Sequence, residues 1–394
     1  MSGTWNAGDV RKVFFLGVSF FFIMGCTNVS YFLPVYYEGQ GYSIKAAGLL
    51  VSAFYITSVS LRPFLAGVVH AIGFRKLFIL AGIACVAASA CVACAGENFW
   101  LGFVSRAVLG AGSSLFQVGL ATYQAMAFAE NVRGRAYSLI MAGCLLPMMT
   151  LVPLADWFLH SGRDGLYILL PLVASAGALL FAPFIPILAT GAGGPGEARS
   201  RSPFYDLPEL VRLPVFLPAL LSFFLFCLTD ATAAFMANMT SHYGLMASYF
   251  LSSNALVGVA VRIFCARQLD RYPRWALSAP SILITAGTAF LASFEPTQTS
   301  LIVLGLVFGV GMGFGFPLHL ALVSDGVPGK LQPQAVSLSW FLMGLDFALV
   351  PMLLGWMGML WGPVTAFRVL CLFALGGALL SGVWWLRVKR GGRR

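Results

Sequence analysis

Long uninterrupted runs of apolar residues determine what this chain can fold into. The run from Val13 to Val35 contains no charged residue, and about 20 apolar residues are enough to cross a bilayer as a helix. Of the 394 residues, 59% are hydrophobic and 10% are charged, whereas soluble domains are roughly 45–50% apolar and about 25% charged. We therefore expect an all-α integral membrane protein. The unbroken runs also disfavour a membrane β-barrel, in which apolar and polar residues alternate.

Twelve apolar blocks separated by polar loops predict 12 transmembrane helices. The blocks cover residues 12–37, 45–69, 77–95, 99–128, 136–158, 166–188, 214–238, 247–267, 275–293, 301–325, 334–358 and 364–388. Composition changes only in residues 189–213, which contain a polar stretch rich in Gly, Pro, Ser and Arg that is typical of a flexible linker. This organisation predicts a six-helix bundle over 1–188, a cytoplasmic linker over 189–213 and a second six-helix bundle over 214–394.

The basic residues favour one side of the predicted membrane topology. Of the 24 Lys and Arg residues, 18 fall in loops or at the adjoining span ends on the side of the N-terminus, the linker and the C-terminus, and three fall on the other side. The positive-inside rule then places both termini in the cytoplasm, and we expect a multi-pass protein of a bacterial inner membrane. Since topology explains the net charge of +10, we expect no nucleic-acid partner.

The two predicted halves repeat one another. A shift of 200 positions places Arg62 on Arg262, and a shift of 199 places Gly110 and Gly112 on Gly309 and Gly311. Paired six-helix halves are typical of transporters whose halves move about a central site.

Two loops and one span carry patterns of a known family. Residues 66–76 read A-G-V-V-H-A-I-G-F-R-K, residues 130–136 read E-N-V-R-G-R-A, and the fourth span contains R-A-V-L-G-A-G from Arg106 to Gly112. The first resembles the G-x-x-x-D-R-x-G-R-[RK] loop of the major facilitator superfamily, with His70 at the acidic position. The others resemble its acid-then-R-G-R-A loop and its R-x-x-x-G-x-G span. The resemblance covers essentially the whole chain and implies a secondary transporter with two pseudo-symmetric bundles.

The loop charges suggest a cytoplasmic gate. Charge pairs between loops can hold one side of a transporter shut and must separate when it opens. In the first half the candidates are His70, Gly73, Arg75, Lys76, Glu130 and Arg133. In the second half they are Asp270, Arg271 and Asp325. The alternative is that these charges only orient the loops and contact anionic lipid.

Six ionisable side chains fall inside the predicted spans, away from the outermost residues: Arg62, Arg106, Asp230, Arg262, His319 and Asp346. Such groups are costly in hydrocarbon unless they are paired or face water, so each is a functional candidate. Asp346 near the middle of its span is the first candidate for proton coupling, followed by Asp230. The resemblance adds Arg106, which matches an arginine that the family associates with proton coupling or with an anionic group. Either carboxylate could instead be neutralised permanently by an arginine, and Arg106 could be structural.

A second set of residues is predicted to contact substrate. It comprises Arg106, Asn28, Gln117, Tyr123, Gln124, Asn238, His319 and Trp340. A lone histidine in a helix is more often a packing group, so His319 remains open. The repeated positions of Arg62 and Arg262 next to the gate loops suggest a structural or gating role.

These features favour a proton-coupled transporter working by alternating access, with efflux by antiport of a small organic molecule, zwitterionic or metal-chelating, as the leading hypothesis. Uptake of an organic anion with protons is the alternative. A membrane enzyme is disfavoured because no paired acids or His cluster occur at one depth, and a membrane sensor is disfavoured because we expect it to carry a soluble domain, which the sequence does not show. All eight cysteines lie in apolar segments, so we expect no metal site, disulfide or cofactor. The expected partners are substrate, protons and the lipid bilayer, and the expected state is a monomer.

Overall fold

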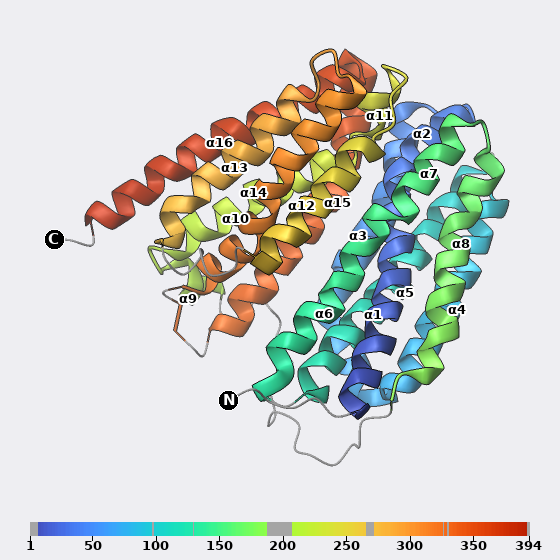
Figure 1. Cartoon of the computed structure of the whole chain (residues 1–394), viewed down its shortest axis with the longest axis horizontal. Coiled ribbons are helices and arrows are strands. Elements are labelled where there is room, and N and C mark those ends of the chain that lie inside the picture. Colours follow the sequence, from blue (N-terminus) through green and yellow to red (C-terminus); the bar gives the residue numbers. More distant parts are fainter. Residues whose placement is uncertain are drawn as a thin grey trace. The chain divides into compact units, whose positions relative to one another are not determined.

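The computed structural model describes residues 7–96, 98–128, 130–186, 207–264, 272–325, 327–328 and 331–391, and these are all-helical (Figure 1). In the first half of the chain the elements are α1 (Ala7–Val29), η1 (Ser30–Phe32), α2 (Leu33–Gly39), α3 (Ile44–Ile72), α4 (Phe74–Cys94), α5 (Phe99–Ala127), α6 (Glu130–Met149), α7 (Leu151–His160), α8 (Asp164–Phe181) and η2 (Ala182–Phe184). In the second half they are α9 (Leu207–Val211), α10 (Phe216–Ala234), α11 (Ala237–Ser241), α12 (Ser248–Phe264), α13 (Arg274–Leu291), α14 (Gln298–Ser324), α15 (Gln332–Trp361) and α16 (Pro363–Gly391).

The helices coincide with the predicted membrane spans. Among the described residues, ten helical segments are long and apolar enough to cross a membrane. The other two predicted spans are also helical, because α12 is an apolar helix of 17 residues and α13 has 18 residues. The all-helical membrane fold is therefore confirmed, and these segments fit twelve spans.

Two predicted spans are interrupted. The first span contains the 3₁₀ turn η1 between α1 and α2, and such turns within a long helix often mark hinges. The fifth span, predicted over 136–158, consists of α6 and α7, which meet at Thr150. Pro153 has no N–H to continue the helical bonding back to Met149, which accounts for this break.

The chain forms two compact units. Unit 1 contains residues 1–33 and 53–201, and unit 2 contains residues 34–52 and 202–394. Unit 2 thus includes α2 from Pro34 and the start of α3, which pack with helices of the second half of the chain. Glycines permit this packing, because a Cβ added at Gly48 would lie 2.5 Å from the Pro351 carbonyl oxygen and one at Gly355 would lie 2.7 Å from that of Ile44.

Glycines at repeat-related positions allow close helix contact inside each unit. In unit 1, a Cβ added at Gly110 of α5 would overlap the Phe54 carbonyl oxygen of α3. In unit 2, a Cβ added at Gly309 of α14 would lie 2.6 Å from the Asn254 carbonyl oxygen of α12. Gly112 and Gly311 make the corresponding close approaches to α4 and α13. Small residues at such spacing let membrane helices pack backbone to backbone.

Candidate substrate and proton sites

Arg106 lies at the centre of a polar cluster in unit 1. Its side chain is fully buried in α5, and its Nη1 donates a hydrogen bond of 3.0 Å to Ser30 Oγ. The guanidinium carbon lies 4.8 Å from the centre of the Phe54 ring, within cation–π range. The turn η1 positions Ser30, whose hydroxyl also donates to the Cys26 carbonyl oxygen. This arrangement holds a cation inside the helical bundle in contact with a hydroxyl and an aromatic ring.

A second arginine of unit 1, Arg62, contacts α5 through Gln117. Arg62 of α3 donates from Nη2 to Gln117 Oε1 at 3.3 Å, and Gln117 Nε2 donates to Ser113 Oγ at 3.1 Å. The Nε atom of Arg62 is inaccessible to solvent and has no hydrogen-bond partner. Predicted cavity residue Gln117 is therefore bonded to an arginine that we expected to be structural.

Three further predicted cavity residues of unit 1 have different environments. Asn28 of α1 is buried. Tyr123 donates its hydroxyl hydrogen to the Pro186 carbonyl oxygen at 2.6 Å, and its ring packs edge-on against Phe74. Gln124 is fully buried, and neither polar atom of its side chain has a hydrogen-bond partner. The contacts of Tyr123 favour packing, whereas Gln124 retains unused hydrogen-bonding capacity.

Asp346 is the most isolated acid in the described part of unit 2. Its side chain in α15 has no exposed surface, and neither carboxylate oxygen has a hydrogen-bond partner. An ionised carboxylate held away from water without a partner costs several kcal/mol, so this environment favours the neutral acid. Asp230 of α10 lies near enough for the two acidic groups to interact electrostatically.

Asp230 has a cationic neighbour that Asp346 lacks. Its charge interacts with that of Arg262 on α12. The Arg262 guanidinium also lies 5.7 Å from the centre of the Phe316 ring of α14, and Phe316 packs edge-on against Trp340 of α15. Unit 2 thus combines two acids, one arginine and an aromatic pair, and it brings predicted residues Asp230, Arg262 and Trp340 into one group of contacts.

His319 is a fully buried packing residue of unit 2. Its Nδ1 is 2.7 Å from the Gly315 carbonyl oxygen and its Nε2 is 3.0 Å from Ser278 Oγ. Its ring stacks on Phe226 at 4.8 Å. Because both ring nitrogens are used, the geometry favours the packing alternative over a substrate ligand.

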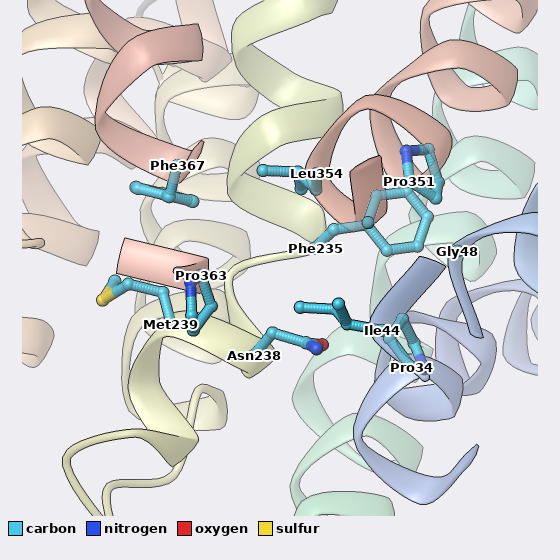
Figure 2. A pocket seen from close by; sticks show the side chains of 11 residues that line it. Pro34, Ile44, Gly48, Phe235, Asn238, Met239, Pro351, Leu354, Pro363 and Phe367 are labelled. Carbon is cyan, nitrogen blue, oxygen red and sulfur yellow. The ribbon is translucent and has the colours of Figure 1, made fainter. Parts of the chain in front are cut away.

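Asn238 lines a small pocket in unit 2 (Figure 2). Its amide donates to Glu38 of α2, and it is the one polar side chain among the lining residues, Pro34, Ile44, Gly48, Phe235, Asn238, Met239, Pro351, Leu354, Gly355, Pro363 and Phe367. The free space takes about one water molecule. This pocket is therefore no substrate-sized cavity, and Asn238 joins α11 to α2.

Comparison with known proteins identifies the family. The sequence profile of the Major Facilitator Superfamily matches residues 15–339 and 232–394. The chain belongs to the major facilitator superfamily. No curated protein matches it by sequence comparison.

Solved structures share this superfamily's fold with the chain. A mutant of the nucleoside transporter NupG has 14% sequence identity and a TM-score of 0.76, with 96% of this chain and 98% of that chain covered. The peptide transporter POT in complex with sulfate has 14% sequence identity and a TM-score of 0.76, with 96% of this chain and 95% of that chain covered. A POT family transporter in complex with 5-aminolevulinic acid has 13% sequence identity and a TM-score of 0.74, with 98% of each chain covered. At these identities the similarity establishes the fold alone, while family membership supports a membrane transporter over an enzyme.

The superfamily loop pattern of the first half is partly visible. Gly73 has a φ of 75°, a conformation that favours glycine, and α4 begins directly after it. Arg75 and Lys76 are exposed in the first turn of α4. His70 lies in α3, and Glu130 and Arg133 lie in α6, but their side chains fall outside the described residues. For these three residues of the predicted first-half gate, the structure therefore gives the position of the backbone and not of the side chain.

The corresponding region of unit 2 contains an ion pair that we did not predict. Arg274 Nη1 donates to both carboxylate oxygens of Asp325, at 2.8 and 3.1 Å, and so joins the start of α13 to the end of α14. Asp270 and Arg271 lie outside the described residues. The shift of 199 that relates the glycines places Arg75 on Arg274, so the internal repeat contained the signal for the arginine of this pair.

Proposed function

We propose that the chain is a proton-coupled secondary transporter that exports a small organic molecule by antiport. The observation that carries this proposal is Asp346, a fully buried acid of α15 with no hydrogen bond to either carboxylate oxygen. Such a group stays neutral while it is buried and releases its proton when the protein opens it to water. This is the property that a proton carrier needs in an alternating-access cycle.

Competition for Asp346 supports exchange over cotransport. A carboxylate with no protein partner can be neutralised either by a proton or by a cationic group of the substrate, but not by both. Proton entry then favours substrate release, which is the linkage that antiport requires. Asp230 is less suited to this role because its charge interacts with that of Arg262.

The buried arginine of unit 1 supports a substrate with an anionic group as well. Arg106 contacts a hydroxyl and an aromatic ring, and a guanidinium readily binds carboxylates through charge-assisted hydrogen bonds. Each unit thus offers charge of one sign, a cation in unit 1 and acids in unit 2, and a zwitterionic or metal-chelating solute is the substrate class that we propose. The same arginine favours the second candidate function, uptake of an organic anion with protons.

The sign of a proton flux separates the two functions. Proteoliposomes containing a pH-sensitive dye are loaded with the zwitterion 5-aminolevulinic acid, which one similar structure holds, and are diluted into buffer without it. Antiport brings protons inward as substrate leaves and acidifies the interior, whereas symport carries protons outward and makes the interior alkaline. Alkalinisation would overturn the antiport proposal.

A matched pair of acids tests the proton carrier in the same assay. We expect Asp346→Asn to abolish the proton flux. Asp156→Asn is the control, because Asp156 is also buried but its Oδ1 lies 3.2 Å from His160 Nδ1. Equal proton flux in wild type and Asp346→Asn would remove Asp346 as the carrier.

The topology and gate are part of the same proposal. We place both termini on the cytoplasmic side of a bacterial inner membrane, on the grounds of the biased Lys and Arg distribution, and assign Arg75 and the Arg274–Asp325 pair to the gate on that side. The protein works as a monomer in this scheme. A C-terminal fusion to green fluorescent protein should fluoresce, and a C-terminal fusion to alkaline phosphatase should be inactive. The reverse result would invert the topology.

A further inference from the structure

Arg62 presents an unused hydrogen-bonding edge inside unit 1. The Nε and Nη2 atoms of an arginine form one side of its planar fork, the side that binds a carboxylate through two parallel bonds. In Arg62, Nε is inaccessible to solvent and has no partner, while Nη2 makes only a long hydrogen bond of 3.3 Å to the amide oxygen of Gln117. The edge is thus half empty, and its one partner is neutral.

A buried donor left in this state is costly. An unsatisfied polar group costs about 1–3 kcal/mol, and more when it carries charge. Arg62 also lies in a helix long and apolar enough to span the membrane, where a cation normally pairs or faces water. Among the described residues, no Asp or Glu forms a hydrogen bond or ion pair with Arg62.

Arg368 in unit 2 shows the same edge when the protein fills it. Its Nε donates to Ser293 Oγ at 3.0 Å and its Nη2 donates to the Ser293 carbonyl oxygen at 2.7 Å. The guanidinium also lies 4.1 Å from the centre of the Phe294 ring. Arg368 therefore has a complete set of contacts on the edge that Arg62 leaves half empty.

A polar track continues from Arg62 along α5. Gln117 links the guanidinium to Ser113, and Gln124 follows Gln117 by seven residues, which places both amides on one face of the helix. Gln124 is fully buried with both polar atoms unpartnered. Two independent side chains on this part of unit 1 therefore have hydrogen-bonding capacity that none of the described residues uses.

We propose that Arg62 and Gln117 form a binding site for the carboxylate of a small solute, with Arg62 Nε and Nη2 as the donors. The carboxylate displaces the Gln117 oxygen from Nη2, and the freed amide of Gln117 turns its NH₂ group toward the solute. The site is distinct from Arg106, which bonds Ser30. This site rests on the proposed transport function only in that the bound solute is then the one transported. Binding itself requires no transport.

Equilibrium titration of the purified protein in phosphatidylcholine nanodiscs tests the site. Benzoate is the probe, and benzamide is its neutral analogue of nearly the same shape. We expect benzoate to bind and benzamide not to bind. We expect Arg62→Gln to weaken one benzoate binding event about tenfold or more, because a charge-assisted bidentate contact is lost, and Arg62→Lys to give an intermediate loss. Arg368→Gln should leave benzoate binding unchanged.

Gln117→Glu keeps the test decisive even if Arg62→Gln does not fold. This variant places a carboxylate where the arginine edge lies, so it should abolish the same binding event and raise the unfolding temperature of the ligand-free protein. Unchanged benzoate binding in Gln117→Glu, or equal binding of benzoate and benzamide, would overturn the proposal. A loss of benzoate affinity when phosphatidylglycerol replaces phosphatidylcholine would assign the edge to a lipid headgroup and overturn the solute site.

The same titration separates this proposal from the proposed transport function. Arg106→Gln should remove a different binding event from the one that Arg62→Gln removes. If Arg62→Gln is silent while Asp346→Asn abolishes proton flux, the site is wrong and the transport function stands. If Arg62→Gln loses binding while proton flux is unaffected by Asp346→Asn, the site stands without that coupling mechanism.

Discussion

Two arginines at repeat-related positions have different neighbours within their own units. In unit 1, Arg62 of α3 donates to Gln117 of α5. In unit 2, Arg262 of α12 lies over the ring of Phe316 of α14, and its charge interacts with that of Asp230. The shift of 199 that aligns the glycine pairs also aligns Gln117 with Phe316. The contact is therefore repeated in position while its chemistry differs.

The glycines at repeat-related positions, in contrast, make the same kind of close contact in both units. Gly110 and Gly309 approach a backbone carbonyl oxygen of the neighbouring helix at the same place in each unit, and Gly112 and Gly311 do so toward the next helix. Packing has thus been kept in both repeats, whereas charge has not. Unit 1 has the buried Arg106, which contacts a hydroxyl, and the half-buried Arg62, which contacts an amide, whereas unit 2 has the acids Asp230 and Asp346.

The largest effect should come from breaking the shared packing. Gly110→Ala should lower the free energy of unfolding by about 3 kcal/mol or more, because the added Cβ would overlap the Phe54 carbonyl oxygen and overpacking is costly. Gly309→Ala should cost less, since its Cβ would lie 2.6 Å from the Asn254 oxygen. Thermal unfolding in detergent measures both. Gly376→Ala is the control, with no heavy atom within 4 Å of the added Cβ, and equal stability of Gly110→Ala and Gly376→Ala would contradict the packing argument.

The next effect should come from giving unit 1 the acid of unit 2. The shift of 200 aligns Ser30 with Asp230, and Ser30 Oγ is 3.0 Å from Arg106 Nη1. On the proposed function, Ser30→Asp should neutralise Arg106 and lower the transport of a zwitterionic solute about 10- to 100-fold, as expected when a charge-assisted bond from Arg106 to the solute is replaced by an internal one. Ser30→Asn has nearly the same shape without the charge, and an equal loss in both variants would show that size, not charge, is responsible.

Much of the fold could be predicted from the sequence because membrane spans leave a strong signal. A helix in a bilayer must bond its own backbone and expose apolar side chains, so long apolar runs specify its place and length. Even the boundary of the fourth span, predicted at 99–128, coincides with α5 at Phe99–Ala127. The 34–52 segment of unit 2 could not be predicted in this way, because its packing depends on the approach of Gly48 to Pro351 far along the chain.

The candidate site was only partly accessible from sequence. Burial of Arg106 and Asp346 follows from their positions within apolar runs, and both are buried. The roles of Arg62 and His319 depend on which atoms of the neighbours they meet. His319 uses both ring nitrogens and Arg62 leaves one donor unused; no spacing in the sequence distinguishes these outcomes.

A smaller effect is expected when His319 is replaced by its repeat counterpart. The shift of 199 aligns His319 with Leu120, which is fully buried in unit 1. His319→Leu leaves Ser278 without its bond to Nε2 and should lower the free energy of unfolding by about 1–2 kcal/mol. The pH dependence of transport should not change, because both ring nitrogens are used in packing contacts with Gly315 and Ser278. A shifted pH profile would restore His319 as a proton or substrate ligand.

The smallest effect on stability should come from the exposed Arg274–Asp325 pair. Arg274 and Asp325 have side chains that are 33% and 47% exposed, and such pairs contribute about 0–1 kcal/mol. Arg274→Gln should therefore leave the unfolding temperature nearly unchanged. Its effect should appear in the transport rate, because a gate that closes through this pair would close less often, and the effect should weaken at high salt.

Charge reversal decides whether the pair or its separate charges matter. Arg274→Asp alone should slow transport, since it places two acids at the contact between α13 and α14, and combining it with Asp325→Arg should restore the rate. Arg212→Gln, which removes an exposed positive charge directly after the end of α9 at Val211, controls for net charge. If the double reversal transports no better than Arg274→Asp alone, the pair does not act as a unit. Arg75 of unit 1, which the shift of 199 aligns with Arg274, would then be the next residue to test as the gate.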